Sequence, residues 1–372
     1  MAIEESACCS ISAHRRRVQN TASAEQNKNN QVNQIGNNPV DQNTNTSAFG
    51  HVATSEKAHE TSASGAFVRQ KNRFDTPFGA KPGQLPVEAG RYRLIWTPLC
   101  PWATRQKIAL GLLGIGEDVI SVGKVNPVRT PEGWEFSLDP GGKDPVLGIR
   151  YLPEIYAETD PSYEGRATVP TIVDVKTHKV VNNDYHRLTN YWETVWKPFW
   201  KEGAPDLYPK ELRTGIDALN EILFNEINNG VYKAGFAETQ AEYEKNYHLV
   251  FDRLDWLEAH LAENRFLFGD RLTDSDIRLY VTLARFDSAY YFEFRLNKKR
   301  IRDYDNLWNY AKELQSIPAF REATDFDAIK RGYFLGDAGT NPYQILPLGP
   351  DNSVWEEPNN RTEKFGPLKY RY

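Results

Sequence analysis

The chain of 372 residues contains only three cysteines, and two of them, Cys8 and Cys9, are adjacent in a polar stretch near its start. Cys100 is therefore the single cysteine of the part that carries apolar patterning, which excludes a disulfide framework. This use of cysteine is typical of a reducing compartment. We therefore expect a cytoplasmic protein.

Long apolar runs, strong net charge and common cofactor motifs are also missing. The sequence has no uninterrupted apolar run of about 18 residues, so we expect no membrane-spanning segment. Its net charge is only -5, which gives no sign of a surface for nucleic acid. It has no GxGxxG motif, P-loop, zinc cluster or histidine pair at metal-ligand spacing, and we expect no metal.

Bulky apolar residues are scarce at the start of the chain. Residues 1–65 are dense in Asn, Gln, Ser and Thr, with scarcely one bulky apolar residue between Val18 and Phe49. Such a segment cannot bury enough surface to offset its chain entropy, so we predict a disordered polar tail. The remaining chain is long enough for two domains with cores of their own.

The best-defined local pattern runs from Arg91 to Leu113. Alternating aromatic and branched residues predict a strand, Pro98 ends it, and Pro101 suits the first turn of the following helix. Cys100 then lies at a helix N-terminus, where unpaired N–H groups favour a thiolate, and Arg105 adds positive charge. The pattern therefore predicts a nucleophilic cysteine with a lowered pKa.

The spacing around Cys100 limits its redox chemistry. A dithiol oxidoreductase has a resolving cysteine three residues on, but that position here is Ala103. The site can form a mixed disulfide with a small thiol but no internal disulfide. The alternative is that Cys100 is an inert buried residue, because free cysteine is among the most buried residue types.

Cys100-Pro101-Trp102-Ala103 after a strand resembles the active-site signature of the glutathionyl-hydroquinone reductases, the xi class of glutathione transferases. Further matches follow in the same order and extend the resemblance over roughly residues 65 to 352. They are Gly133-Trp134-Glu135-Phe136, 165–170 (GRATVP), 275–287 (SDIRLYVTLARFD), 303–314 (DYDNLWNYAKEL), Ile329-Lys330-Arg331, Asn341-Pro342 and Leu348-Gly349-Pro350.

The resemblance implies the glutathione transferase fold, an α/β thioredoxin-like N-terminal domain followed by an all-α C-terminal domain. We place the first domain, which binds the thiol, at 66–184 and the helical domain at 185–330. A C-terminal extension, 331–372, follows. The resemblance also implies a homodimer formed through the helical domain.

Local patterns agree with this division. Segments 118–125, 169–175 and 179–181 predict a strand parallel to the first and then a hairpin, which is the thioredoxin order. Five prolines in 126–165 predict a long insertion without regular structure. In the helical domain, Thr273 followed by Asp276 predicts a capping box at a helix start, which makes Asp276 structural.

The family's thiol-binding positions can be carried over residue by residue. The resemblance implies that Trp134 lies against bound glutathione. It also implies a cis Val169–Pro170 bond, and such a turn would direct the Val169 N–H and C=O toward a peptide-like thiol. Arg150 and Arg166 are both candidates to orient the carboxylate of the thiol.

One departure from the family occurs just after these positions. Family members commonly carry Glu-Ser at the start of the following helix, where these residues grip the γ-glutamyl group, and this chain has Asp184-Tyr185. Asp184 can still bond an ammonium group. Tyr185 is much bulkier than serine, so we expect it either to reshape the thiol pocket or to pack on the next helix. The departure leaves the identity of the thiol open.

The resemblance also assigns the second substrate and the reaction. Tyr290 and Tyr333 are placed facing the thiol, where phenolic groups suit a hydroquinone. We expect a thiol-dependent reductase that removes glutathione from glutathionyl-hydroquinones through a mixed disulfide at Cys100, with glutathione as co-substrate. The alternatives are a monothiol glutaredoxin-like activity on protein or small disulfides, and a binding protein without catalysis.

Overall fold

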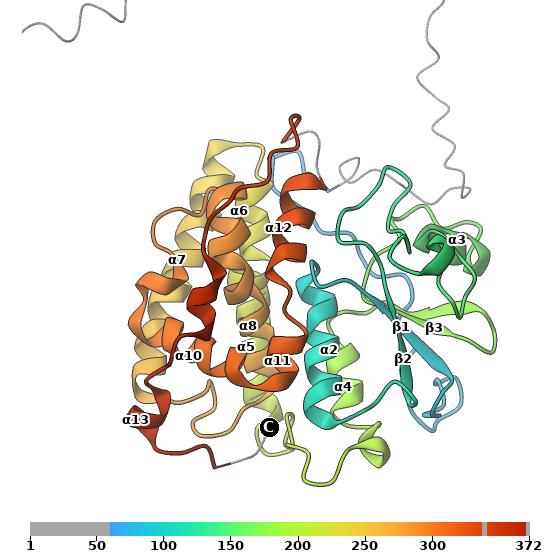
Figure 1. Ribbon diagram of the computed structural model, residues 1–372, viewed down its shortest axis with the longest axis horizontal. Coiled ribbons are helices and arrows are strands. Elements are labelled where there is room, and N and C mark those ends of the chain that lie inside the picture. Colours follow the sequence, from blue (N-terminus) through green and yellow to red (C-terminus); the bar gives the residue numbers. More distant parts are fainter. Residues whose placement is uncertain (1–59, 337–340, 370–372) are drawn as a thin grey trace, which may run out of the picture. The chain divides into compact units, whose positions relative to one another are not determined.

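The computed structural model describes residues 60–336 and 341–369, so most of the predicted polar tail lies outside the described residues. A four-stranded sheet forms the first part of the fold (Figure 1), in the order β2-β1-β3-β4. Its strands are β1 (Tyr92–Trp96), β2 (Ile120–Lys124), β3 (Thr171–Asp174) and β4 (Lys179–Asn182).

The pairing of the strands confirms the predicted thioredoxin-like order. β1 is parallel to β2, with Tyr92 opposite Ile120, and antiparallel to β3. β3 and β4 form the antiparallel hairpin. Every residue of β1 is buried, and helix α2 (Pro101–Leu113) follows it after a short turn. The central strand and α2 are thus the rigid elements on which the turn carrying Cys100 is built.

One prediction for the insertion is wrong. Residues 126–165 include helix α3 (Leu152–Thr159), which packs against β4. Pro153 lies in the first turn of α3, where the missing N–H breaks no hydrogen bond, so this proline starts a helix rather than preventing one. Outside α3, this stretch contains the 3₁₀ turn η1 (Pro140–Gly142) and two isolated β-bridges, Thr130 with Gly133 and Glu135 with Tyr151.

The lead-in to β1 packs on the domain that follows it. Phe78 contacts Tyr92, Trp192 and Trp196, with ring centroids 5.1 to 5.6 Å apart. Residues 60–65, which we predicted to belong to the tail, instead contact the folded part, and Thr61 pairs with Phe67.

The second part of the fold is helical, as predicted. Two π-helical turns continue helices of this part: η3 (Phe224–Asn228) extends α5 (Arg213–Leu223), and η4 (Phe286–Tyr290) extends α8 (Asp274–Arg285). No helix of the described residues combines the length and apolarity needed to cross a membrane. The elements are α4 (Leu188–Trp192), η2 (Lys197–Phe199), α5 (Arg213–Leu223), η3 (Phe224–Asn228), α6 (Gly230–Gly235), α7 (Gln240–Glu263), α8 (Asp274–Arg285), η4 (Phe286–Tyr290), α9 (Tyr291–Glu293), η5 (Ile301–Asp303), α10 (Asp305–Ser316), α11 (Pro318–Glu322) and α12 (Phe326–Leu335).

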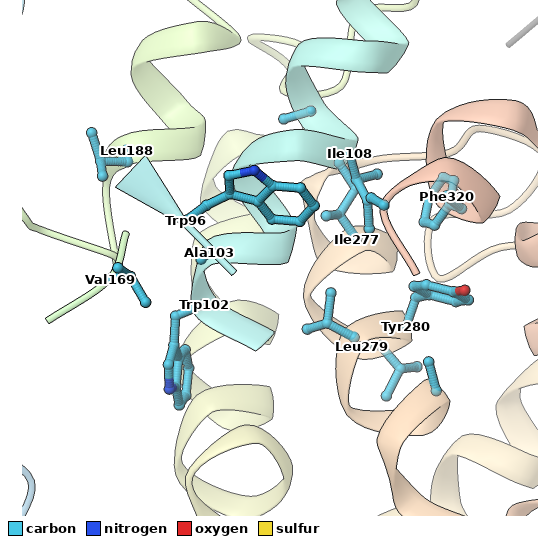
Figure 2. Packing of buried hydrophobic residues seen from close by; sticks show 14 of the residues in the cluster. Trp96, Trp102, Ala103, Ile108, Val169, Leu188, Ile277, Leu279, Tyr280 and Phe320 are labelled. Carbon is cyan, nitrogen blue, oxygen red and sulfur yellow. The ribbon is translucent and has the colours of Figure 1, made fainter. Parts of the chain in front are cut away.

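Helix α8 is buried along its whole length and packs against α2 (Figure 1). Figure 2 shows Ile108 of α2 beside Ile277 of α8, and both side chains are fully buried. The predicted capping box is confirmed, because Asp276 accepts from the Thr273 N–H at 2.8 Å. Asp276 also accepts from the Tyr310 hydroxyl, so it is a structural acid.

The last segment returns to the helical part. Residues 341–369 carry η6 (Asn352–Glu356) and α13 (Arg361–Phe365). The buried Arg361 guanidinium donates to the carbonyls of Leu261, Asn264 and Arg265, all within 2.8 Å. The boundary that we predicted at residue 330 falls inside α12, because the apolar face of that helix continues to Leu335.

Candidate active site

Cys100 occupies the turn between β1 and α2. It is the N-cap residue of α2, its carbonyl accepts from the Thr104 N–H at 2.9 Å, and its side chain is half-buried. The Val169–Pro170 bond is cis, as the family resemblance implied. The Cys100 thiol donates to the Val169 carbonyl at 3.3 Å. The predicted nucleophile and the backbone of the predicted thiol-binding turn are therefore in direct contact.

The helical part fixes the position of this turn through Arg285, at the end of α8. The Arg285 side chain is fully buried and donates to the carbonyl of Pro98 at 2.6 Å and to that of Leu99 at 2.9 Å. It also donates to the Thr104 hydroxyl at 2.9 Å. One rigid guanidinium thus binds both sides of Cys100, and it places a positive charge close to the sulfur.

The predicted lowering of the Cys100 pKa is wrong for this pocket. Burial raises the pKa of the thiol, because a thiolate loses solvation there. The Ala103 N–H and the Arg285 charge lower the pKa, and the Trp102 N–H and Arg69 add smaller effects in the same direction. These groups do not overcome the cost of burial, so the pKa stays above its ordinary value.

Arg105, which we expected to activate the cysteine, packs against Trp102. Its guanidinium lies 4.6 Å from the centre of the Trp102 ring and donates to Asn228 at 2.8 Å. Burial lowers the pKa of Arg105 to about 9. Arg105 therefore supports the Trp102 ring, which is part of the wall of the pocket.

A first prediction follows from the raised pKa of Cys100. The thiolate is the reactive form, so the rate constant for alkylation by iodoacetamide should still be rising with pH at about 8.5, the pKa of a free cysteine. The measurement uses the variant with Cys8→Ser and Cys9→Ser, so that Cys100 alone reacts. A plateau below pH 8 would contradict the prediction and restore the thiolate inferred from the helix N-terminus.

Cys100 opens into a cavity of about 370 Å³, a size typical of sites for small ligands. Both parts of the fold contribute to its wall. The lining residues that the site chemistry can use are Arg69, Cys100, Trp102, Trp134, Arg166, Val169, Tyr185, Tyr232 and Tyr333.

Three tyrosine hydroxyls form a hydrogen-bonded cluster at this wall. The hydroxyls of Tyr232 and Tyr333 are 2.6 Å apart, and those of Tyr290 and Tyr333 are 2.9 Å apart. Tyr333 lines the cavity, as the resemblance implied, whereas Tyr290 is fully buried behind it and lines no part of the cavity. Tyr290 therefore supports the two hydroxyls that can reach a substrate.

Sequence reasoning missed Tyr232, which lines the cavity from α6. Its ring contacts those of Trp102 and Tyr290 at centroid distances of 6.2 and 5.8 Å. Burial raises the pKa of Tyr232, so its hydroxyl stays protonated and can donate. No local signal distinguishes it among 19 tyrosines, because α6 reaches the site only through the packing of the helices.

The two residues that depart from the family pattern behave differently. Asp184 lies outside the cavity lining, where it accepts from the Asn72 side chain at 3.1 Å and from the His186 N–H at 3.0 Å. Tyr185 lines the cavity and also packs on Trp102, with ring centroids 4.9 Å apart. The structure therefore places Tyr185 at the wall of the pocket, packed on a residue of α2, and the contact with Trp102 is not the predicted packing on the next helix.

Of the two candidate arginines, one lies at the cavity and the other does not. Arg166 lines the cavity and forms an ion pair with Glu60 at 2.5 Å. Arg150 is exposed and lies over the ring of Tyr151, away from the lining. Trp134 lines the cavity beside these groups. Within the ranges that the structure describes, no cluster of three metal-ligating side chains occurs.

Comparison with known proteins identifies relatives of this chain. The family model described as "Glutathione S-transferase, C-terminal domain" matches residues 240–313. Glutathionyl-hydroquinone reductase YqjG of Escherichia coli (strain K12) is 37% identical over 314 residues, which cover 82% of this chain and 95% of that protein.

Solved structures are similar in fold as well as in sequence. The glutathione-S-transferase Xi from Phanerochaete chrysosporium is 35% identical, with a TM-score of 0.77 over 83% of this chain and 99% of that one. The glutathione-bound structure of YqjG from Escherichia coli K-12 is 36% identical, with a TM-score of 0.72. This second match covers 81% of this chain and 99% of that one.

Proposed function

Because the chain belongs to the glutathionyl-hydroquinone reductases, the xi class of glutathione transferases, we propose that it removes glutathione from glutathionyl-hydroquinones. The observation that carries the proposal is the shared cavity, in which a single reactive cysteine faces two tyrosine hydroxyls. Sulfur chemistry at Cys100 and proton transfer at an aromatic ring can occur there together.

The reaction divides into cleavage of a carbon–sulfur bond by Cys100 and a thiol–disulfide exchange. The Cys100 thiolate attacks the sulfur of the conjugate and forms a disulfide, while the bond between that sulfur and the ring carbon breaks. An aryl carbanion is a poor leaving group, so that ring carbon must first take up a proton as the hydroquinone becomes its keto tautomer. The electron pair of the broken bond then restores the aromatic ring and leaves a phenolate oxygen.

We assign the supply of the proton to the Tyr232 hydroxyl. The substrate hydroxyl that becomes the keto oxygen loses its proton, and the bond between Tyr333 and Tyr232 gives this proton a route back to Tyr232. Glutathione then attacks the mixed disulfide, which releases glutathione disulfide and regenerates Cys100. The ring carbon is reduced by two electrons, and one glutathione thiol and the thioether sulfur of the conjugate become a disulfide, so electrons balance without a further reductant.

The enclosed position of Cys100 favours small conjugates over protein disulfides. Its sulfur is half-buried and bonded to Val169 inside a cavity of about 370 Å³. A folded protein carrying a mixed disulfide would have to bring its own backbone into that space. The glutaredoxin-like alternative therefore has less structural support than the reduction of small conjugates.

Glutathione is the thiol that the relatives support, since the structure of one of them holds it. In this chain we assign its contacts to Trp134, the Val169–Pro170 turn and Arg166, all of which line the cavity or border it. Arg166 must exchange its ion pair with Glu60 for a carboxylate of the thiol.

The proposed function is tested by incubating the full chain with glutathione and a glutathionyl-hydroquinone. We expect one free hydroquinone and one glutathione disulfide for each conjugate consumed. Intact mass spectrometry should find the protein heavier by one glutathionyl group when the second thiol is withheld. Turnover of glutathionylated peptides without turnover of the conjugates would favour the glutaredoxin-like alternative.

A second prediction concerns the thiol and rests on Tyr185. The double change Asp184→Glu and Tyr185→Ser should lower the Michaelis constant for glutathione by about one to two decades. The longer carboxylate can extend into the space that the Tyr185 ring leaves and form one charge-assisted hydrogen bond there. Alkylation of Cys100 should change less. Tyr185→Phe is the matched control, because it keeps the ring on Trp102 and should leave the Michaelis constant unchanged.

The opposite result would be equally informative. If the double variant binds glutathione more weakly, Tyr185 belongs to a working pocket for a different thiol, and glutathione is the wrong co-substrate.

We also propose that the protein works in the cytoplasm as a homodimer. The support for the compartment is the use of cysteine, since the chain has only three cysteines and no disulfide framework, as is typical of proteins in reducing compartments. The support for the dimer is the family resemblance, and the oligomeric state is measured by sedimentation of the full chain.

A further inference from the structure

Arg69 lines the cavity, and the proposed reaction gives it no role. It lies in the lead-in to β1, and its guanidinium carbon is 4.7 Å from the centre of the Tyr232 ring and 4.9 Å from that of Trp102. Its Nε donates to the Asn229 side chain at 2.7 Å. The guanidinium is thus held in place over the ring of the proposed proton donor.

The hydrogen bonds of Arg69 are incomplete. Its Nη2 is buried and has no hydrogen-bond partner among the residues that the structure describes. Arg166 differs, because Glu60 neutralises its charge in the same cavity. A buried guanidinium N–H without an acceptor is costly, and the Arg69 side chain also lines the cavity, so it can gain a partner when a ligand brings an anionic oxygen there.

The charge of Arg69 acts on the reacting groups. It lowers the pKa of Cys100 and is the largest influence that lowers the pKa of Tyr232. Arg69 therefore lies close enough to both groups to stabilise negative charge that develops between them. In the proposed reaction this charge appears on the oxygen next to the carbon that loses sulfur.

From this juxtaposition we infer that Arg69 binds the phenolate oxygen of the departing hydroquinone, with Tyr232 on one side and Cys100 on the other. The inference rests on the proposed function. The S–C electron pair moves through the ring to this oxygen, Arg69 stabilises the anion, and a proton then converts it to the hydroquinone. The role is that of an oxyanion site built from a single fork of N–H donors.

The test measures kcat for a series of glutathionyl-hydroquinones whose phenol acidities differ through chloro and methyl substituents. Arg69→Met should lower kcat by about 10²-fold for the least acidic phenol, the typical loss of one oxyanion donor, and much less for the most acidic. The dependence of kcat on phenol pKa therefore becomes steeper. Arg69→Lys keeps the charge and should restore most of the wild-type dependence.

Arg213→Met is the matched control. Arg213 also stacks on an aromatic ring, 4.9 Å from the centre of Tyr208, and also donates through Nε, but it lies outside the cavity lining. Its loss should leave the dependence on phenol pKa unchanged. Equal melting temperatures establish that the variants are folded to the same extent. Equal alkylation of the denatured proteins establishes that their cysteines are intact.

The outcomes separate the two proposals. An Arg69→Met variant that loses activity equally for every phenol, or that changes only the Michaelis constant for glutathione, overturns the assignment of Arg69 and leaves the reductase function standing. The second result would instead make Arg69 a binding group for a carboxylate of the thiol. A wild-type protein that turns over none of the conjugates overturns the function, and this inference with it.

Discussion

Replacing Cys100 by serine should lower kcat for glutathionyl-hydroquinones by at least about three orders of magnitude, because the sulfur that forms the mixed disulfide is lost. A serine hydroxyl stays protonated at neutral pH and cannot take its place. The fold should be retained, since serine is a favoured N-cap residue and Cys100 occupies the N-cap of α2. The measurement is steady-state turnover together with the melting temperature.

The other two cysteines provide the control. Cys8→Ser with Cys9→Ser should change neither turnover nor stability, because neither sulfur takes part in the proposed reaction and both residues lie in the polar stretch near the start of the sequence. A Cys100→Ser variant with an unchanged rate would remove the mixed-disulfide mechanism altogether. If the rate fell only in the Cys8 and Cys9 variant, the nucleophile would be one of these two cysteines near the start of the chain.

The second large effect is expected at Tyr232. Tyr232→Phe keeps the ring that supports Arg69 and removes the hydroxyl that bonds Tyr333 at 2.6 Å. If this hydroxyl donates the proton to the ring carbon, kcat should fall by about 10²- to 10⁴-fold, the usual contribution of a general acid. The second half-reaction, release of Cys100 from its mixed disulfide by glutathione, should keep its rate.

Tyr243→Phe is matched to this variant, since the Tyr243 hydroxyl donates to the Arg295 carbonyl at 2.7 Å from a position outside the cavity lining. It should retain wild-type turnover. If Tyr232→Phe stays within about threefold of the wild type, well below the contribution of a general acid, Tyr333 or a water molecule must supply the proton instead.

Much of the first part of the fold could be predicted because its signals are local. Alternating side chains define β1, Pro101 and the apolar spacing define α2, and together they place Cys100 at the helix start. Such patterns depend on neighbours a few residues apart, which a sequence displays directly. The same kind of signal failed for α3, because a proline is compatible with both a loop and a first helical turn.

The sequence alone therefore determined that this protein has one usable cysteine, no resolving partner for it, and a strand-turn-helix that presents it. Only the tertiary structure decided which distant groups surround the sulfur. Packing brings Arg285 onto the turn, and it places Tyr232 and Arg69 in the cavity. The pKa of Cys100 was decided there too, since burial depends on what covers a residue rather than on its neighbours in sequence.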